Sequence, residues 1–161
     1  MIEFVWSKRK SLLTAGQKLF TVACNVRNEL NGFRTTENPE DVVYTLPPDG
    51  SKPVPYMPRT FPPGRWKITE VKKKDSPYLA PYFIATNAVQ MVEEWSLDTD
   101  GTYKGPTGKM VPDSGYGLHF SSSSTTLGCG KVMRLKDLEA MVEIIWTAFK
   151  NKEDVFIKVE E

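Results

Sequence analysis

The proline distribution limits what this chain can fold into more than any other feature of its sequence. Ten of the twelve prolines lie between Pro39 and Pro81, many of them in the stretch TLPPDGSKPVPYMPRTFPPG. Proline lacks a backbone N–H and fixes φ, so this stretch cannot hold a helix or an interior strand. We therefore predict a long proline-rich loop at about residues 38–63, with the regular structure on either side of it.

Strand-like alternation flanks this loop. Before it, residues 18–26 put one apolar face toward a core, made of Phe20, Val22, Cys24 and Val26. A first strand is expected at residues 2–6, with LLTAGQ as the turn between the two strands. After the loop, residues 65–71 alternate, and the inward set is expected to be Trp66, Ile68 and Glu70.

Further strands are expected between the loop and the C-terminal third. Residues 82–97 hold two apolar runs that separate near Asn87, and Asp100 and Gly101 form a predicted turn. The segment GYGLHF then leads as a strand into a run of serines.

The C-terminal third has the clearest periodicity. After Asp137, the predicted N-cap, apolar residues recur at the spacing of one helical face: Leu138, Met141, Val142, Ile145 and Phe149. A final strand follows, in which Val155, Ile157 and Val159 alternate with other residues. The sequence thus predicts a mostly β domain (β-rich α+β) spanning residues 1–161, with one late amphipathic helix and a closing strand.

Composition and charge narrow the classes of function. A chain of 161 residues with 40% hydrophobic residues suits one globular domain, and a net charge of +1 gives no reason to expect nucleic acid or an acidic membrane as a partner. No stretch is long and apolar enough for a membrane span, and no signal peptide is visible. Two cysteines and one histidine supply too few ligands for zinc, so we expect neither a metal nor another cofactor.

The reactive side chains gather in residues 115–135, GYGLHFSSSSTTLGCGKVMRL. This segment holds His119, the only histidine, and Cys129, which lies between two glycines. Glycine neighbours let another group approach closely, and main-chain N–H groups there can converge on a developing oxyanion. A cysteine nucleophile reacts as the thiolate, and His119 is the side chain available to take its proton.

The same residues also have plainer interpretations. A lone cysteine is most often a small buried hydrophobic residue, and a lone histidine is most often half-buried and hydrogen-bonded. The serines of residues 121–123 fit a polar loop. Cys24 is expected in the core. Residue types alone therefore leave the pairing of Cys129 with His119 open.

The order of the motifs adds a second line of reasoning. FPPGRWKI, GLHF, TTLGCGKVMRL, an amphipathic helix and DVFIKV follow one another from about residue 18 to the end. This succession resembles the L,D-transpeptidase catalytic domain, the YkuD fold, a β-sandwich or barrel. The resemblance is densest in the late block, at Thr126, Gly128, Cys129, Lys131 and Met133.

The resemblance implies a bacterial cysteine enzyme that performs acyl transfer on peptidoglycan stem peptides, as an L,D-transpeptidase or a related L,D-carboxypeptidase or endopeptidase. Cys129 would be the nucleophile, His119 the general base and acid, and the main-chain carbonyl of Phe120 would orient the imidazole. Main-chain N–H groups of Leu127, Gly128 and Cys129 would hold the oxyanion. The residues expected to contact substrate are Tyr116, Thr126, Lys131 and Arg134.

The resemblance also implies where the protein acts and with what. Its partner would be the peptidoglycan stem peptide, and we expect a monomer. The expected location is periplasmic, extracellular or at the cell wall, after export or delivery.

Three positions depart from the family pattern. Phe120 stands where a glycine follows the histidine, Leu127 where a histidine precedes Gly-Cys, and Lys131 where an arginine follows the cysteine. Lysine keeps the charge but lacks the planar fork of arginine, which Arg134 is a candidate to supply. Phe120 and Leu127 favour the alternative function, a non-catalytic cell-wall-binding or phage or virion structural module that retains the fold.

Overall fold

In the computed structural model, eight strands close into a barrel in the order β1-β10-β4-β5-β8-β9-β3-β2. The structure describes residues 1–24, 61–75, 80–97, 103–120 and 129–161. The barrel strands are β1 (Ile2–Ser7), β2 (Leu12–Ala15), β3 (Lys18–Cys24), β4 (Gly64–Lys73), β5 (Tyr82–Thr86), β8 (Gly117–Phe120), β9 (Gly130–Val132) and β10 (Val155–Glu160). The remaining elements are α1 (Leu135–Lys150) and a two-stranded sheet of β6 (Gln90–Leu97) and β7 (Tyr103–Asp113). The predicted β-rich class, with one late helix and a closing strand, is confirmed.

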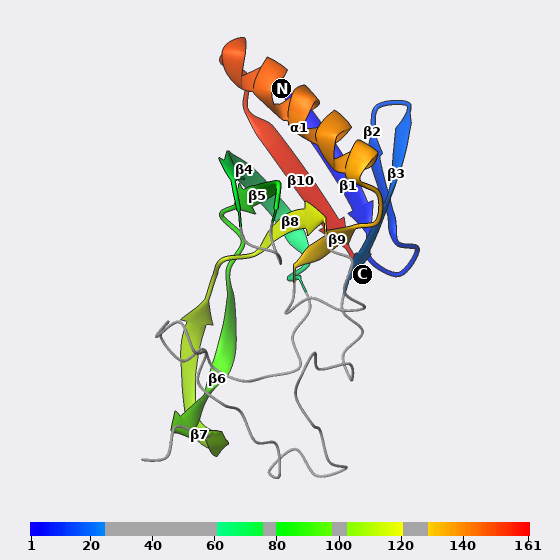
Figure 1. Ribbon diagram of the computed structural model, residues 1–161. Helices are drawn as coiled ribbons and strands as arrows, with labels where there is room; N and C mark the ends of the chain where they lie inside the picture. Colours follow the sequence, from blue (N-terminus) through cyan, green and yellow to red (C-terminus); the bar gives the residue numbers. More distant parts are fainter. Residues whose placement is uncertain (25–60, 76–79, 98–102, 121–128) are drawn as a thin grey trace.

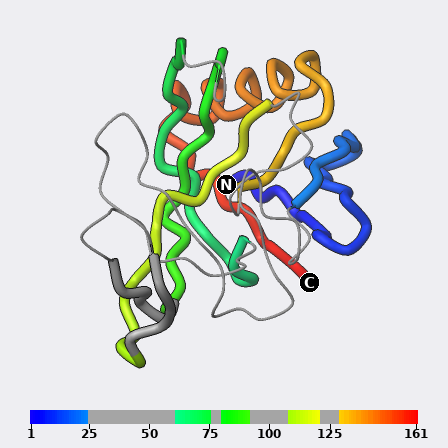
Figure 2. Tube along the Cα trace, turned by 60° about the horizontal axis from the view of Figure 1, so that its bottom comes forward, coloured from blue at the N-terminus to red at the C-terminus, as the bar shows by residue number. Residues whose placement is uncertain are grey.

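Two of the neighbouring strand pairs are parallel. β1 runs parallel to β10, and β8 runs parallel to β9, whereas the other pairs in the barrel are antiparallel. Figure 1 shows β10 between β1 and β4, with α1 on one side of the barrel and the β6–β7 hairpin extending away on the other. Figure 2, from a second direction, shows the same separation of helix and hairpin. β10 therefore pairs with β1 on one side and with β4, from the middle of the chain, on the other.

Alternation along the strands determines which side chains enter the core. In β3, Phe20 and Val22 are buried while Leu19 is 65% exposed, as the period of two predicts. In β10, the three valine and isoleucine side chains predicted to face inward are buried. One apolar cluster contains these residues and the buried face of α1, which consists of Leu138, Met141, Val142, Ile145 and Ala148.

In the barrel, the alternation is interrupted in β4. Trp66 and Ile68 face inward as expected, but the register shifts between Ile68 and Glu70. This β-bulge puts Val71 opposite the buried Ile84 and leaves Glu70 exposed. The expectation that Glu70 shares the inward face is therefore wrong, because a period of two cannot anticipate an inserted residue.

Two local expectations also need correction. LLTAGQ is not all turn: residues 12–15 form β2, because Leu13 is fully buried, and the turn comes at Gly16 with φ +62°. The helix begins at Leu135, so Asp137 is not its N-cap. Asp137 lies in the first turn, where a negative charge interacts favourably with the helix dipole.

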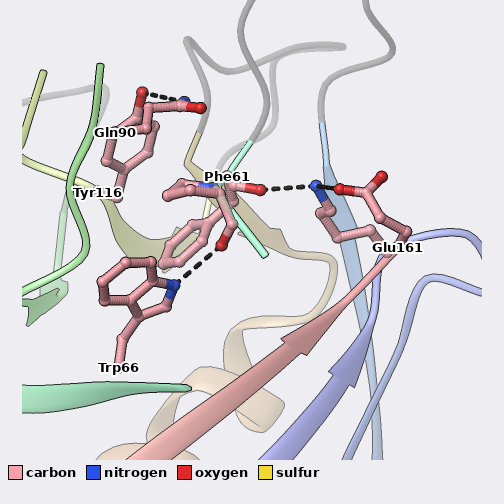
Figure 3. A network of polar contacts seen from close by, with 7 residues as sticks. Phe61, Trp66, Gln90, Tyr116 and Glu161 are labelled. Atoms are coloured by element: carbon pink, nitrogen blue, oxygen red, sulfur yellow. Dashed lines mark hydrogen bonds and ion pairs between the residues drawn. The ribbon is translucent and has the colours of Figure 1, made fainter. Parts of the chain in front are cut away.

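The end of the proline-rich segment is anchored to the barrel. Phe61 is fully buried and packs edge-on against Trp6, with ring centroids 5.2 Å apart. The ammonium group of Lys8 donates to the main-chain carbonyl of Phe61 at 2.6 Å and lies 2.9 Å from a carboxylate oxygen of Glu161 (Figure 3). The indole N–H of Trp66 donates to the carbonyl of Pro62 at 2.9 Å. This segment therefore joins the core where it reaches β4.

Other expectations fall outside the described residues. These are the rest of the predicted loop, at residues 38–60, the turn at Asp100 and Gly101, and Val26 at the end of the predicted early strand. Within the described ranges, no helix has the length and apolar character needed to cross a membrane.

Candidate active site

The candidate site is built on β8 and β9, which lie side by side in the barrel. Their parallel register pairs Leu118 with Gly130 and His119 with Lys131. Cys129 immediately precedes β9. Continuing this register by one residue puts Cys129 level with Gly117, two residues before His119, so the return of Cys129 beside His119 stays a prediction.

Packing around Gly130 shows which residues of β8 and β9 point into the core. A Cβ added at Gly130 would lie 2.3 Å from Leu118 Cδ2 and 2.9 Å from Trp6, so this position faces the core. Its paired neighbour Leu118 is fully buried. By alternation, His119 and Lys131 point to the opposite face of the sheet. The groups that approach Gly130 closely are therefore core side chains. From the sequence we expected another backbone or a ligand to approach here.

His119 makes the main-chain contact that the resemblance implies. Its Nδ1 lies 3.2 Å from the carbonyl oxygen of Phe120. A carbonyl only accepts, so this contact places the proton on Nδ1 and leaves Nε2 of the neutral ring as the acceptor. The ring of Phe83 lies beside the imidazole, with 6.1 Å between the two ring centroids. His119 is only 5% exposed. This contact sets the tautomer of the neutral ring and holds Nδ1 against the Phe120 carbonyl.

Cys129 is half-buried at the start of β9. Its Sγ lies 3.9 Å from the carbonyl oxygen of Gly115, at the outer limit for a thiol donor. Regular strand spacing gives a Cα separation of about 8 Å between His119 and Cys129, because they differ by one strand and two residues. Side chains of these two residues can meet across that separation.

The segment Gly115–Gly117 is shaped by two glycines with different tasks. Gly115 has φ +91°, a backbone conformation that residues with a Cβ rarely adopt, and this conformation accompanies the carbonyl that faces Cys129. At Gly117, a Cβ would lie 2.4 Å from the carbonyl oxygen of Ile84 and 2.4 Å from the ring of Phe83. The absent side chain therefore lets Phe83 fold over β8 beside His119.

Tyr116 anchors this segment, which differs from the expected contact with substrate. It is 2% exposed, and its hydroxyl accepts a hydrogen bond from Gln90 Nε2 at 2.6 Å (Figure 3) and donates one to the Asp113 carboxylate. Its main-chain carbonyl accepts from Thr86 Oγ1 at 2.6 Å. A side chain so enclosed offers no surface to a substrate, so we reassign Tyr116 from substrate binding to support of the site. Two of these partners, Gln90 and Thr86, lie on other strands, and no sequence pattern indicated them.

Replacing Tyr116 with phenylalanine is expected to lower the free energy of unfolding by about 1–3 kcal/mol. The change removes a buried hydroxyl and takes one hydrogen bond from Asp113, which is 6% exposed. Urea unfolding checks the value, with Tyr82→Phe as the matched control. Tyr82 is half-buried and keeps its ring contact with Trp146 as phenylalanine, so we expect a change below about 0.5 kcal/mol there. Equal losses in the two variants would contradict the anchoring role.

Lys131 and Arg134 lie at different ends of the site. Lys131 is opposite His119 and 9% exposed. Arg134 is exposed and directly precedes α1, beyond the end of β9 that is remote from Cys129. The register therefore puts Lys131 beside His119, whereas Arg134 lies beyond β9 at the start of α1.

Three predicted site residues lie outside the described part of the chain: Thr126, Leu127 and Gly128. Of the predicted oxyanion donors, only the N–H of Cys129 belongs to a described residue. In the described ranges, no group of three or more histidine, cysteine or acidic side chains is arranged to hold a metal ion.

An open groove of about 650 Å³ lies away from these residues. It is lined by residues of β1 and the β2–β3 turn, with Ile144 of α1. None of the predicted site residues borders it. We therefore identify the candidate site from its reactive side chains and not from this groove.

The chain was compared with protein-family models, curated proteins and solved structures, and none of the three comparisons gives a match.

Proposed function

We propose that the protein is a cysteine-dependent acyltransferase that acts on peptidoglycan stem peptides, as an L,D-transpeptidase or a related L,D-peptidase. The observation that carries the proposal is the fixed imidazole of His119, with Nδ1 on the Phe120 carbonyl, beside the strand that begins next to Cys129. A nucleophile, a base and a group that orients the base are the parts that such chemistry needs. We infer the class of substrate from the order of the sequence motifs, which resembles that of the L,D-transpeptidase family.

The first half of the proposed reaction forms an acyl-enzyme. Nε2 of His119 takes the proton from the thiol of Cys129, and Sγ attacks the carbonyl carbon of the diamino acid in a donor stem. The negative oxygen that develops is held by main-chain N–H groups at residues 127–129. When the tetrahedral intermediate collapses, the C–N bond breaks and His119 returns the proton to the departing amine of D-alanine.

The second half releases the acyl group. An amine on a neighbouring stem attacks the thioester to give a crosslink, or water attacks it to give a shortened stem. His119 again accepts the proton from the attacking group and returns it to the sulfur. In this proposal Lys131, which lies next to His119 in the register, attracts a carboxylate of the stem.

The substrate implies where the reaction takes place. Peptidoglycan lies outside the cytoplasm, so we propose a periplasmic, extracellular or wall-delivered protein that works as a monomer without a cofactor.

A second candidate function rests on how little of the site is exposed. His119 and Lys131 are 5% and 9% exposed, and the ring of Phe83 covers part of the imidazole. Such burial also suits a structural histidine in a non-catalytic module that binds the cell wall or forms part of a virion. In that case the Phe120 contact would only stabilise the end of β8.

Thiol alkylation separates these two functions. With iodoacetamide near neutral pH, we expect Cys129 to react at least about tenfold faster than Cys24, because a base that takes its proton raises the thiolate fraction. His119→Asn should remove most of that difference. Rates are measured at each cysteine by mass spectrometry of proteolytic peptides, so Cys24 is the internal control. Equally slow labelling of both thiols would support the binding module.

A further inference from the structure

The fold brings together the only two cysteines of the chain, although they are roughly a hundred residues apart in the sequence. Cys24 is the last residue of β3, and in the antiparallel register it pairs with Gly130 of β9. Cys129 is the neighbour of Gly130 along the chain. The two thiols therefore belong to adjacent strands at the same end of the ladder.

Ordinary sheet spacing gives a Cα separation of about 6 Å between Cys24 and Cys129, since they differ by one strand and one residue. Disulfides join Cα atoms that are usually about 4.4–6.8 Å apart. An unbroken ladder would point these two side chains to opposite faces of the sheet. The chain bends at Cys129, so this residue departs from the ladder; its Sγ lies 3.9 Å from the carbonyl oxygen of Gly115, and the side chain must turn toward β3 for the bond to form.

Both thiols have some access to solvent. Each cysteine is half-buried and neither is in a disulfide. Cys24 packs against the apolar core at its edge, whereas Phe20 and Val22 of the same strand are buried within it. A small oxidant can therefore reach this end of the ladder.

From this juxtaposition we infer that Cys24 and Cys129 form a reversible intrachain disulfide when the protein meets a peroxide. The thiolate of Cys129 attacks one peroxide oxygen, the O–O bond breaks, and a sulfenic acid forms at Cys129. The thiolate of Cys24 attacks that sulfur, the S–O bond breaks, and hydroxide leaves as the S–S bond forms. In total, two thiols lose two electrons and two protons, and hydrogen peroxide is reduced to two waters.

The bond would remove the thiol that acyl transfer needs. Formation of the disulfide rests on the strand register together with the bend at Cys129, whereas its effect on turnover rests on the proposed function. Cys24 is then a resolving cysteine that protects Cys129 from further oxidation, and not only a core residue.

The test compares the folded full-length chain with the same chain unfolded in guanidinium chloride. Equilibration in glutathione redox buffers gives the effective concentration of the two thiols in each state. We expect the folded state to exceed the unfolded state by at least about tenfold, because folding holds the strands together. After hydrogen peroxide, mass spectrometry should show a loss of two hydrogens and a peptide that links Cys24 to Cys129.

The matched variant is Cys24→Ser, with circular dichroism to verify that it folds. It should show no loss of two hydrogens, and dimedone should trap a sulfenic acid at Cys129 instead. An effective concentration in the folded state that equals or falls below the unfolded value, or disulfides only between molecules, would overturn the inference. If the disulfide forms but the reduced protein has no activity on stem peptides, the proposed function fails and the disulfide stands.

Discussion

Cys129→Ala is expected to abolish the release of D-alanine from muropeptides and the formation of crosslinked products. Loss of the attacking sulfur leaves no covalent route, so we expect turnover to fall by about a thousandfold or more. Products from the wild type and the variant are compared by liquid chromatography and mass spectrometry. Identical product profiles from the two proteins would show that Cys129 is not the nucleophile.

The second cysteine provides the matched control. Cys24→Ala under reducing conditions should keep activity near that of the wild type and lower the free energy of unfolding by about 1 kcal/mol, the effect of losing a small, partly buried group. A folded Cys24→Ala protein without turnover would mean that the reactive thiol has been wrongly assigned.

Gly117→Ala is expected to produce the largest loss of stability among single changes near the site. The added methyl group would lie 2.4 Å from the carbonyl oxygen of Ile84 and 2.4 Å from the Phe83 ring. A main-chain oxygen cannot move without disturbing the pairing of β5 with β8, so we expect a loss of about 3 kcal/mol in the free energy of unfolding. Denaturant unfolding followed by tryptophan fluorescence measures it.

Gly16→Ala serves as the control for glycine replacement itself. Gly16 has φ +62° with no heavy atom within 4 Å of an added Cβ, so only the backbone conformation opposes alanine there. We expect a loss of about 1 kcal/mol at this position. A loss at Gly117 no larger than that at Gly16 would show that β5 and β8 adjust easily.

Much of the barrel could be predicted from local patterns. The alternation in β3 and β10 and the helical spacing after Leu138 reflect burial on one face, which a single segment expresses by itself. The bulge in β4 escaped prediction because it depends on how Val71 meets Ile84 on a neighbouring strand. The start of the helix also differs from its predicted position. Arg134 occupies the N-cap position with no side-chain hydrogen bond, so the usual capping signal is absent.

The candidate site likewise has contacts that could be predicted from the sequence and contacts that could not. His119, Cys129 and the contact of the imidazole with Phe120 involve residues close in sequence, and the resemblance to the L,D-transpeptidase family implied that contact. The contact of Tyr116 with Gln90, the position of Phe83 beside His119 and the proximity of Cys24 to Cys129 all arise from strand pairing. No pattern within one segment carries such information.

The position of β10 between β1 and β4 bears on how the chain folds as it leaves the ribosome. β1 (Ile2–Ser7) leaves the ribosome well before its parallel neighbour β10 (Val155–Glu160). Until translation reaches that strand, β1 and β4 both keep an unpaired edge, and exposed edges invite pairing with other chains. The barrel can therefore close only after β10 has been synthesised, and a nascent chain halted before that point would leave both edges exposed to other chains.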